Sequence, residues 1–109
     1  MASAKAKEIA SSTAVVVFSK TYCDACKEVV SLLVKLGASY KLIELDLESD
    51  GAEMQSALAD WTGQRSVPNI FIGGNHIGGR SDVMAKHDEG KLMALLKDAG
   101  ALPSSSPSV

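Results

Sequence analysis

The two cysteines of this chain stand two residues apart and follow its longest uninterrupted apolar run. Residues 14–18, Ala-Val-Val-Val-Phe, form a largely β-branched segment of the kind expected for a strand buried on both faces. After four intervening residues comes Cys23, and Cys26 completes a Cys-x-x-Cys motif where a helical pattern of apolar residues begins. This order predicts a buried strand, a short loop and a helix whose first turn carries both thiols.

A cysteine at a helix N-terminus is chemically distinctive, because unpaired backbone N–H groups and the helix dipole stabilise its thiolate. We therefore expect Cys23 to be exposed, acidic and nucleophilic. Cys26, one turn further on, is expected to be shielded and to attack a mixed disulfide formed on Cys23. Lys20 and Lys27 are expected to lower the pKa of the Cys23 thiol, and Asp24 is expected to oppose them.

Other uses of a close cysteine pair remain open at this point. The pair is an inert structural element, a redox centre, an iron–sulfur ligand or part of a zinc site. A zinc site is disfavoured, because the separation of His76 and His87 does not match the short histidine spacing of zinc modules. A disulfide framework for a small secreted fold would use more cysteines, spread along the chain.

The remaining periodicities predict an α/β domain with a mixed sheet and helices on both faces. An initial strand–helix–strand unit is followed by a helix, a hairpin around Gly73-Gly74 and closing helices. We expect one domain over residues 1–109, with its core at about 12–102 and a disordered Ser/Pro-rich tail at 103–109. The predicted segments are helices at 1–12, 24–36, about 51–62, from 81 and about 92–99, and strands at 14–18, 40–47, 70–72 and 76–78.

Charge and hydropathy narrow the range of partners. The 109-residue chain carries a net charge of −2, so it has no basic field for nucleic acid or an anionic membrane. Its longest apolar run is far shorter than the ~20 residues of a membrane helix. The first twelve residues hold no apolar segment of signal-peptide length. We therefore predict a cytoplasmic protein, with an organelle as the alternative.

Groups suited to a ligand with two carboxylates and an amine lie on both sides of the cysteine motif along the chain. Lys20 and Arg65 are cations, and Ser81-Asp82 follow Gly78-Gly79 at a predicted helix start, where backbone N–H groups receive a carboxylate. A cis-proline at Val67-Pro68 would leave backbone groups free to pair with an extended peptide. Taken singly, each has an ordinary explanation: a turn, a solvated charge or a helix cap.

Three segments together resemble the glutaredoxin family, in particular its dithiol, class I members from plants and algae. They are Val17-Phe18-Ser19-Lys20-Thr21-Tyr22-Cys23, the stretch from Trp61 to Asn69, and the stretch from Phe71 to Gly79. The similarity extends from about Ala14 to Leu102. It implies a thioredoxin-like fold with a central four-stranded mixed sheet, and a glutathione-dependent thiol–disulfide oxidoreductase that reduces protein–glutathione mixed disulfides.

The resemblance also implies roles for particular residues. Cys23 would be the nucleophile and Cys26 the resolving thiol, with glutathione as co-substrate and glutathionylated proteins as partners. Val67 would pair with glutathione through its backbone, and Pro68 would be cis. Independently of the resemblance, our default expectation is a monomer unless a cluster bridges two chains. The glutathione-binding residues implied are Lys20, Tyr22, Gln55, Arg65, Val67, Pro68, Gly79, Ser81 and Asp82.

The active-site motif departs from the family's usual Cys-Pro-Tyr-Cys. Here it reads Cys23-Asp24-Ala25-Cys26, which lacks the rigid proline and the aromatic wall and adds a negative charge beside the nucleophile. Arg80 stands where the family often has cysteine, and it would supply a cation near a glutathione carboxylate. Two alternatives stay open. The first is a dimer that bridges a [2Fe-2S] cluster through Cys23 and glutathione, which the small Ala25 favours and the charge of Asp24 opposes. The second is a redox-silent glutathione-binding module.

Overall fold

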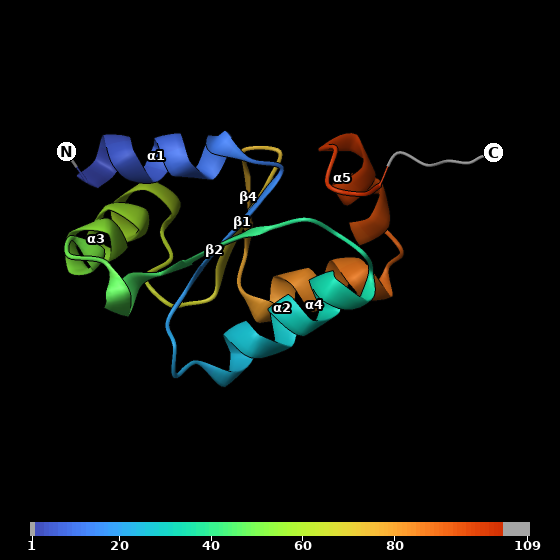
Figure 1. Ribbon diagram of the computed structural model, residues 1–109, viewed down its shortest axis with the longest axis horizontal. Helices are drawn as coiled ribbons and strands as arrows, with labels where there is room; N and C mark the ends of the chain where they lie inside the picture. The colour runs from blue at the N-terminus through green and yellow to red at the C-terminus, as the bar shows by residue number, and fades with distance from the viewer. Residues whose placement is uncertain (1, 104–109) are drawn as a thin grey trace.

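Four strands form one mixed sheet at the centre of the molecule. The computed structural model describes residues 2–103 (Figure 1), and the strands of its sheet lie in the order β2–β1–β3–β4. The first strand, β1 (Val15–Ser19), runs parallel to β2 (Lys41–Glu44) and antiparallel to β3 (Asn69–Ile72). A tight turn joins β3 to the antiparallel β4 (Asn75–Gly78). The sheet is therefore mixed and four-stranded, as the sequence predicted.

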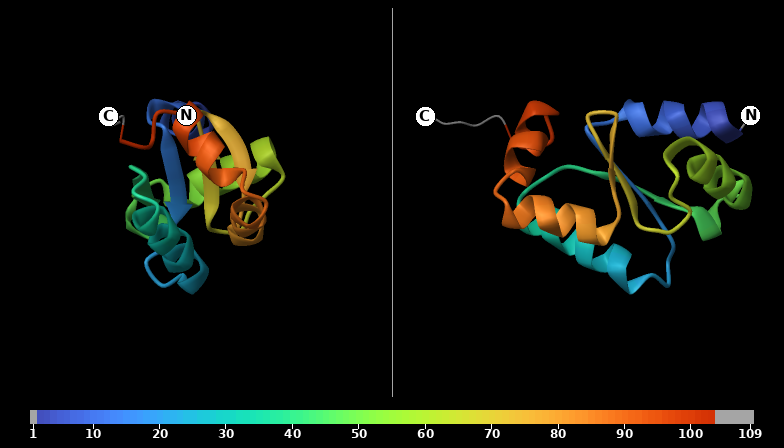
Figure 2. Two further views of the ribbon diagram at one scale, coloured as in Figure 1. Left: turned by 90° about the vertical axis from the view of Figure 1, so that its right-hand side faces the viewer. Right: turned by 180° about the vertical axis from the view of Figure 1, so that it is seen from behind.

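Five helices cover the sheet in two layers. On one face α1 (Ala2–Ser12) lies beside α3 (Gly51–Thr62), and on the other α2 (Asp24–Lys35) lies beside α4 (Arg80–Asp88), as Figures 1 and 2 show. The last helix, α5 (Leu92–Asp98), packs into the same core as α2 and α4.

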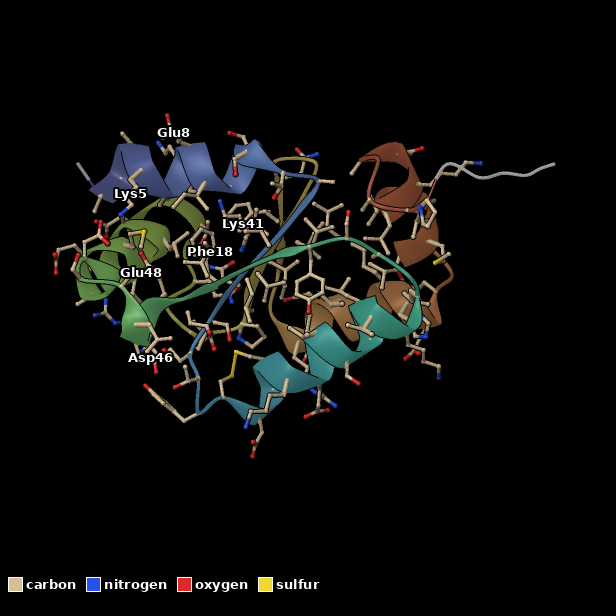
Figure 3. The ribbon with its side chains drawn as sticks, viewed as in Figure 1. Lys5, Glu8, Phe18, Lys41, Asp46 and Glu48 are labelled. Atoms are coloured by element: carbon tan, nitrogen blue, oxygen red, sulfur yellow. A yellow bond between two sulfur atoms is a disulfide. The ribbon has the colours of Figure 1, made fainter. Side chains whose placement is uncertain are left out.

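β1 is buried along its whole length because both of its faces are covered. Val15 and Val17 pack with α2, α4 and α5, whereas Val16 and Phe18 belong to the second core, under α1 and α3. Phe18 points into this second core (Figure 3), where its ring meets Phe71 of β3 edge to face at 5.8 Å. The continuous β-branched run is thus explained by two separate apolar layers that share one strand.

The second strand is shorter than the sequence predicted. Residues 40–47 were expected to form one strand, but β2 ends at Glu44 and Leu45–Leu47 form a 3-10 turn. The alternation of apolar and polar residues continues past Glu44, yet Leu45 is drawn into the core beneath α1 and α3. There the chain leaves the sheet edge and turns toward α3.

The start of α3 lies directly against this 3-10 turn. A Cβ atom on Gly51 would lie only 1.7 Å from the Leu45 carbonyl oxygen, so a side chain at this position is excluded by backbone atoms. On the outside, Lys5 of α1 forms an ion pair with Asp50 at 2.8 Å. The hydrogen bond to Asp50 raises the pKa of Lys5, and the same bond lowers the pKa of Asp50.

The other predicted elements agree with the structure to within a residue or two at their ends. α2 ends at Lys35 instead of Leu36, and α4 begins at Arg80 instead of Ser81. Trp61, which the helical pattern placed on the buried face of α3, is 38% exposed and stacks on Phe71 with ring centroids 5.0 Å apart. The predicted tail at 103–109 falls, apart from Pro103, outside the described residues.

Candidate active site

Cys23 caps α2 with its own side chain. It is the N-cap residue of the helix, and its Sγ atom accepts a hydrogen bond from the backbone N–H of Cys26 at 3.1 Å. The two cysteines are joined by a disulfide, with Cα atoms 5.2 Å apart. Cys23 is half-buried, whereas Cys26 is only 2% exposed. The arrangement gives an accessible thiol at a helix N-terminus with a shielded thiol behind it, although Cys23 is less exposed than expected.

The loop between α3 and β3 faces this cysteine. The Val67–Pro68 peptide bond is cis, as the resemblance implied. The Val67 carbonyl oxygen lies 3.9 Å from Cys23 Sγ. Pro68 and Asn69 are buried where the loop enters β3. A backbone segment able to pair with a peptide therefore stands directly beside the nucleophilic position.

A cleft of about 450 Å³ opens between this loop, the first turn of α2 and the start of α4. It brings together five residues that the resemblance implied for glutathione binding, and adds four others. The five are Val67, Pro68, Gly79, Ser81 and Asp82; the four are Ala25, Gln64, Ser66 and Arg80.

The start of α4 is shaped by a close approach of backbone and carboxylate. The Gly79 N–H donates a hydrogen bond to Asp82 Oδ2 at 2.9 Å. Gly78 has a φ of +124°, and a Cβ atom there would lie 2.2 Å from the same Oδ2 atom. Only glycine fits at this position, so Gly78 allows Asp82 to cap the helix at the edge of the cleft.

The other implied glutathione residues lie apart from that cleft. Lys20 and Gln55 line a second hollow of about 300 Å³ near the 3-10 turn. Tyr22 is 69% exposed, with its ring 6.0 Å from Lys20 Nζ. Arg65 is exposed, and its carbonyl oxygen accepts a hydrogen bond from Gln55 Nε2 at 2.9 Å. The structure therefore divides the implied set between two neighbouring regions.

The loop leading to Cys23 is tied to the 3-10 turn by Asp46. Its carboxylate accepts hydrogen bonds from the Thr21 hydroxyl and from the Thr21 N–H, the latter at 3.0 Å. The Thr21 hydroxyl is the main reason that the pKa of Asp46 lies below its ordinary value, and Lys20 adds a smaller effect in the same direction. Asp46 itself lies near the beginning of α2 in Figure 3.

Two expected charges of the site are already engaged with neighbours. Arg80, expected to offer its cation to glutathione, donates from Nε to Glu28 of α2 at 2.8 Å while it lines the cleft. Lys27 was expected to lower the pKa of the Cys23 thiol, and its Nζ atom lies 4.0 Å from Asp24 Oδ1. Both members of the Asp24–Lys27 pair are well exposed, so water screens their interaction.

Sequence reasoning missed three polar residues that hold the site together. Thr21 and Asp46 are 25 positions apart, and nothing in either segment indicates that they meet. Gln64 was passed over although its amide bonds two carbonyls of the proline loop. Its position inside the Trp61–Asn69 segment was the one available signal.

Comparison with known proteins decides the family. The glutaredoxin family model matches residues 15–77, more than half of the chain. The chain belongs to the glutaredoxin family. A glutaredoxin of Ricinus communis is 63% identical over 102 residues, which cover 94% of this chain and all of the relative. Glutaredoxin-C4, chloroplastic, of Oryza sativa subsp. japonica is 62% identical over 106 residues, covering 97% of this chain and 80% of that one.

Solved glutaredoxin structures share the same architecture. A crystal structure of a buckwheat glutaredoxin–glutathione complex superposes with a TM-score of 0.93 at 55% identity, covering 94% of each chain. The sheet and its two helical layers are therefore the thioredoxin-like fold of glutaredoxins. As a glutaredoxin with its dithiol pair in place, the protein is a glutathione-dependent thiol oxidoreductase.

Two further observations concern metals and membranes. Within residues 2–103, no three His, Cys, Asp or Glu side chains lie close enough together to hold a metal ion. The cluster-bridging alternative draws on two chains, and this chain would contribute Cys23 to it. In the same part of the chain, no helix is both long and apolar enough to cross a membrane.

His76 of β4 should report on the proline loop by its titration. Its Nε2 atom lies 2.7 Å from Asn69 Oδ1, and its ring packs on Phe71 at 5.2 Å. Partial burial lowers the pKa of His76 below 6.5, and the Asp82 carboxylate acts in the opposite direction. An NMR titration of the ring protons should therefore give a midpoint below 6.5.

The same shift has a consequence for stability. Between the folded pKa and 6.5 the unfolded chain binds more protons than the folded one, so His76 favours folding fully above 6.5. This contribution should be lost as pH falls from 6.5 through the folded pKa, in urea unfolding at a series of pH values. Asp82→Asn should lower the midpoint of His76 further. A midpoint above 6.5, or one that rises in Asp82→Asn, would contradict the assignment.

Proposed function

We propose that this glutaredoxin reduces protein–glutathione mixed disulfides, with Cys23 as the nucleophile and Cys26 as the resolving thiol. The observation that carries the proposal is the position of Cys23: it caps α2, is half-buried, and lies 3.9 Å from the carbonyl oxygen of Val67, which lines a 450 Å³ cleft. A helix N-terminus stabilises the thiolate, and the thiolate is the attacking species.

Glutathione is held in this proposal by the nine residues that the resemblance implied. Val67 pairs with the tripeptide backbone, and Asp82 offers a carboxylate to its ammonium group. N–H groups at the start of α4, near Gly79 and Ser81, receive a carboxylate. A crystal structure of a buckwheat glutaredoxin–glutathione complex, at 55% identity, supports the binding of glutathione by this fold. The remaining contacts are Pro68 in the cleft, and Lys20, Tyr22, Gln55 and Arg65 outside it.

The chemistry is two successive thiol–disulfide exchanges. The Cys23 thiolate attacks the glutathione sulfur of the substrate; a Cys23–glutathione disulfide forms, the protein–glutathione bond breaks, and the protein leaves as a thiolate that takes up a proton. A second glutathione thiolate then attacks the glutathione sulfur on Cys23, releasing glutathione disulfide and the Cys23 thiolate. With a substrate whose two cysteines form a disulfide, Cys23 first forms a mixed disulfide with one of them, and the other leaves as a thiol. The Cys26 thiolate then attacks Cys23 Sγ, the substrate leaves as a dithiol, and the Cys23–Cys26 disulfide present in the structure forms. Two glutathione molecules reduce this disulfide and leave as glutathione disulfide.

A trapping experiment tests which sulfur is attacked. Cys26→Ser, which keeps the nucleophile and lacks the resolving thiol, is mixed with a peptide carrying one glutathionylated cysteine. Mass spectrometry should show glutathione on Cys23 and the peptide released as a free thiol. Peptide on Cys23 with free glutathione in solution, or no transfer to Cys23, would refute the proposed reaction.

The proposed reaction also bears on the oligomeric state and the compartment of the protein. All the groups invoked belong to one chain, so we propose a monomer. The compartment must supply glutathione. The cytoplasm predicted from the sequence meets that need, as does the chloroplast named for the Oryza sativa relative. Glutathione binding without turnover would favour the redox-silent alternative, and visible absorption by the purified protein would favour the cluster-bridging one.

A further inference from the structure

The proline loop is held in place by side-chain amides. Gln55 Nε2 donates to the Arg65 carbonyl at 2.9 Å. Gln64 Nε2 donates to the Ser66 carbonyl at 3.1 Å and to the Pro68 carbonyl at 2.9 Å. A loop whose carbonyls bond to side chains instead of a neighbouring strand depends on those side chains for its shape.

The Gln64 side chain donates hydrogen bonds to the residues on both sides of Val67. Ser66 and Pro68 are the two neighbours of Val67, and their carbonyl oxygens converge on one NH2 group, which has one proton for each. The Val67 carbonyl is directed elsewhere, 3.9 Å from Cys23 Sγ. Gln64 therefore holds the chain from one side while Val67 faces the nucleophile on the other.

Neighbouring residues hold the Gln64 backbone and lie close to its side-chain amide. Its backbone N–H donates to the Thr62 hydroxyl at 3.1 Å, at the end of α3. A Cβ atom on Gly79 would lie 3.5 Å from Gln64 Nε2 and 3.5 Å from the Pro68 carbonyl oxygen. The start of α4 therefore lies close to the hydrogen bond between Gln64 and Pro68 without a clash. Gln64 also lines the 450 Å³ cleft.

We infer that Gln64 is a positioning residue that pre-organises Val67 for glutathione and so determines the preference for glutathionyl over other mixed disulfides. The inference rests on the proposed function, because Val67 pairs with glutathione only in that proposal. Glutathione presents peptide groups beside its sulfur, which an ordered Val67 backbone can pair with. A mixed disulfide with free cysteine presents charged amino and carboxylate groups in their place. Ordering the loop before the ligand arrives lowers the entropic cost of binding the peptide.

The test compares two mixed disulfides of one peptide, which differ only in the small thiol attached to it. A peptide with a single cysteine is prepared as its mixed disulfide with glutathione and as its mixed disulfide with cysteine. Single-turnover release of the peptide thiol by excess reduced protein is followed against protein concentration, which separates half-saturation from the maximum rate. The variants are Gln64→Met, which keeps the length without either donor, and Gln64→Glu, which keeps the shape and replaces the donor by oxygen. Asp60→Asn, on the exposed surface of α3, is the matched control.

Both Gln64 variants should raise half-saturation by the glutathionyl peptide about five- to tenfold, as expected for the loss of two hydrogen bonds, and leave the maximum rate within about twofold. Their rates with the cysteinyl peptide should match wild type, as should both rates of Asp60→Asn. Unchanged half-saturation, or equal losses with both peptides, would overturn the positioning role. Wild-type protein that transfers no glutathione would instead refute the proposed function.

Discussion

Cys23→Ser is expected to lower glutathione-dependent disulfide reduction by about a thousandfold or more, whereas Cys26→Ser should keep a large part of the activity. Cys23 is the thiol that caps α2 and lies beside the Val67 carbonyl, and a serine hydroxyl there is not ionised at neutral pH. Cys26 is 2% exposed and is needed only when a second thiol of the protein resolves the intermediate. Turnover of a small glutathionyl disulfide, coupled to glutathione reductase, measures both variants.

The difference in activity between the two serine variants tests the mechanism better than the loss of activity in either one. Both remove one sulfur of the same disulfide, so any effect of the missing cross-link on folding is shared and appears in the thermal midpoints of both. Equal loss of activity in the two variants would refute the route through a single thiol, and it would require Cys26 in every turnover. Full activity of Cys23→Ser would exclude Cys23 as the nucleophile.

Gly51→Ala is expected to destabilise the fold by about 3 kcal/mol or more, because the new methyl group meets backbone and not a side chain that can turn away. The Cβ atom would lie 1.7 Å from the Leu45 carbonyl oxygen and 2.8 Å from the Leu45 carbonyl carbon. Relief requires the 3-10 turn and the start of α3 to separate. Urea unfolding followed by circular dichroism measures the change.

Gly90→Ala is the matched control for this prediction. Gly90 has a φ of +74°, and apart from its own chain neighbours no atom lies within 4 Å of its would-be Cβ, so alanine costs only the left-handed backbone, about 1–2 kcal/mol. A loss in Gly51→Ala no larger than that in Gly90→Ala would show that the contact with Leu45 relaxes easily. A larger loss, together with weaker glutathione-dependent activity, would link the 3-10 turn to the loop that Asp46 holds.

The sequence predicted best what depends on neighbouring residues. The β-branched run before the motif and the apolar periodicity after it located β1 and α2, since burial on two faces and on one face leave different patterns. The same reasoning failed beyond Glu44, because alternation alone does not show where a strand leaves the sheet edge. Leu45 turns inward because of a core formed by α1 and α3, which local patterning does not contain.

The site was predictable to the extent that a family resemblance carries residues across. That resemblance supplied the proline loop and the start of α4, and the structure places their residues around one cleft. It did not supply the hydrogen bonds that hold the loops. The Arg80–Glu28 pair spans 52 positions, and the Thr21–Asp46 pair spans 25. Such partners are chosen by the packing of the folded chain, so reading either segment alone does not reveal them.

Successive residues of β1 belong alternately to the two apolar cores. Neither helical layer can therefore separate from the sheet without exposing apolar side chains of β1 to water. Lifting α1 and α3 away would leave Val16 and Phe18 in water, and lifting α2 and α4 would leave Val15 and Val17 there. Either partial opening exposes a strand that the other layer still needs. We therefore expect the two layers to unfold as one cooperative unit, with the cysteine pair at the start of α2 keeping its geometry until that transition.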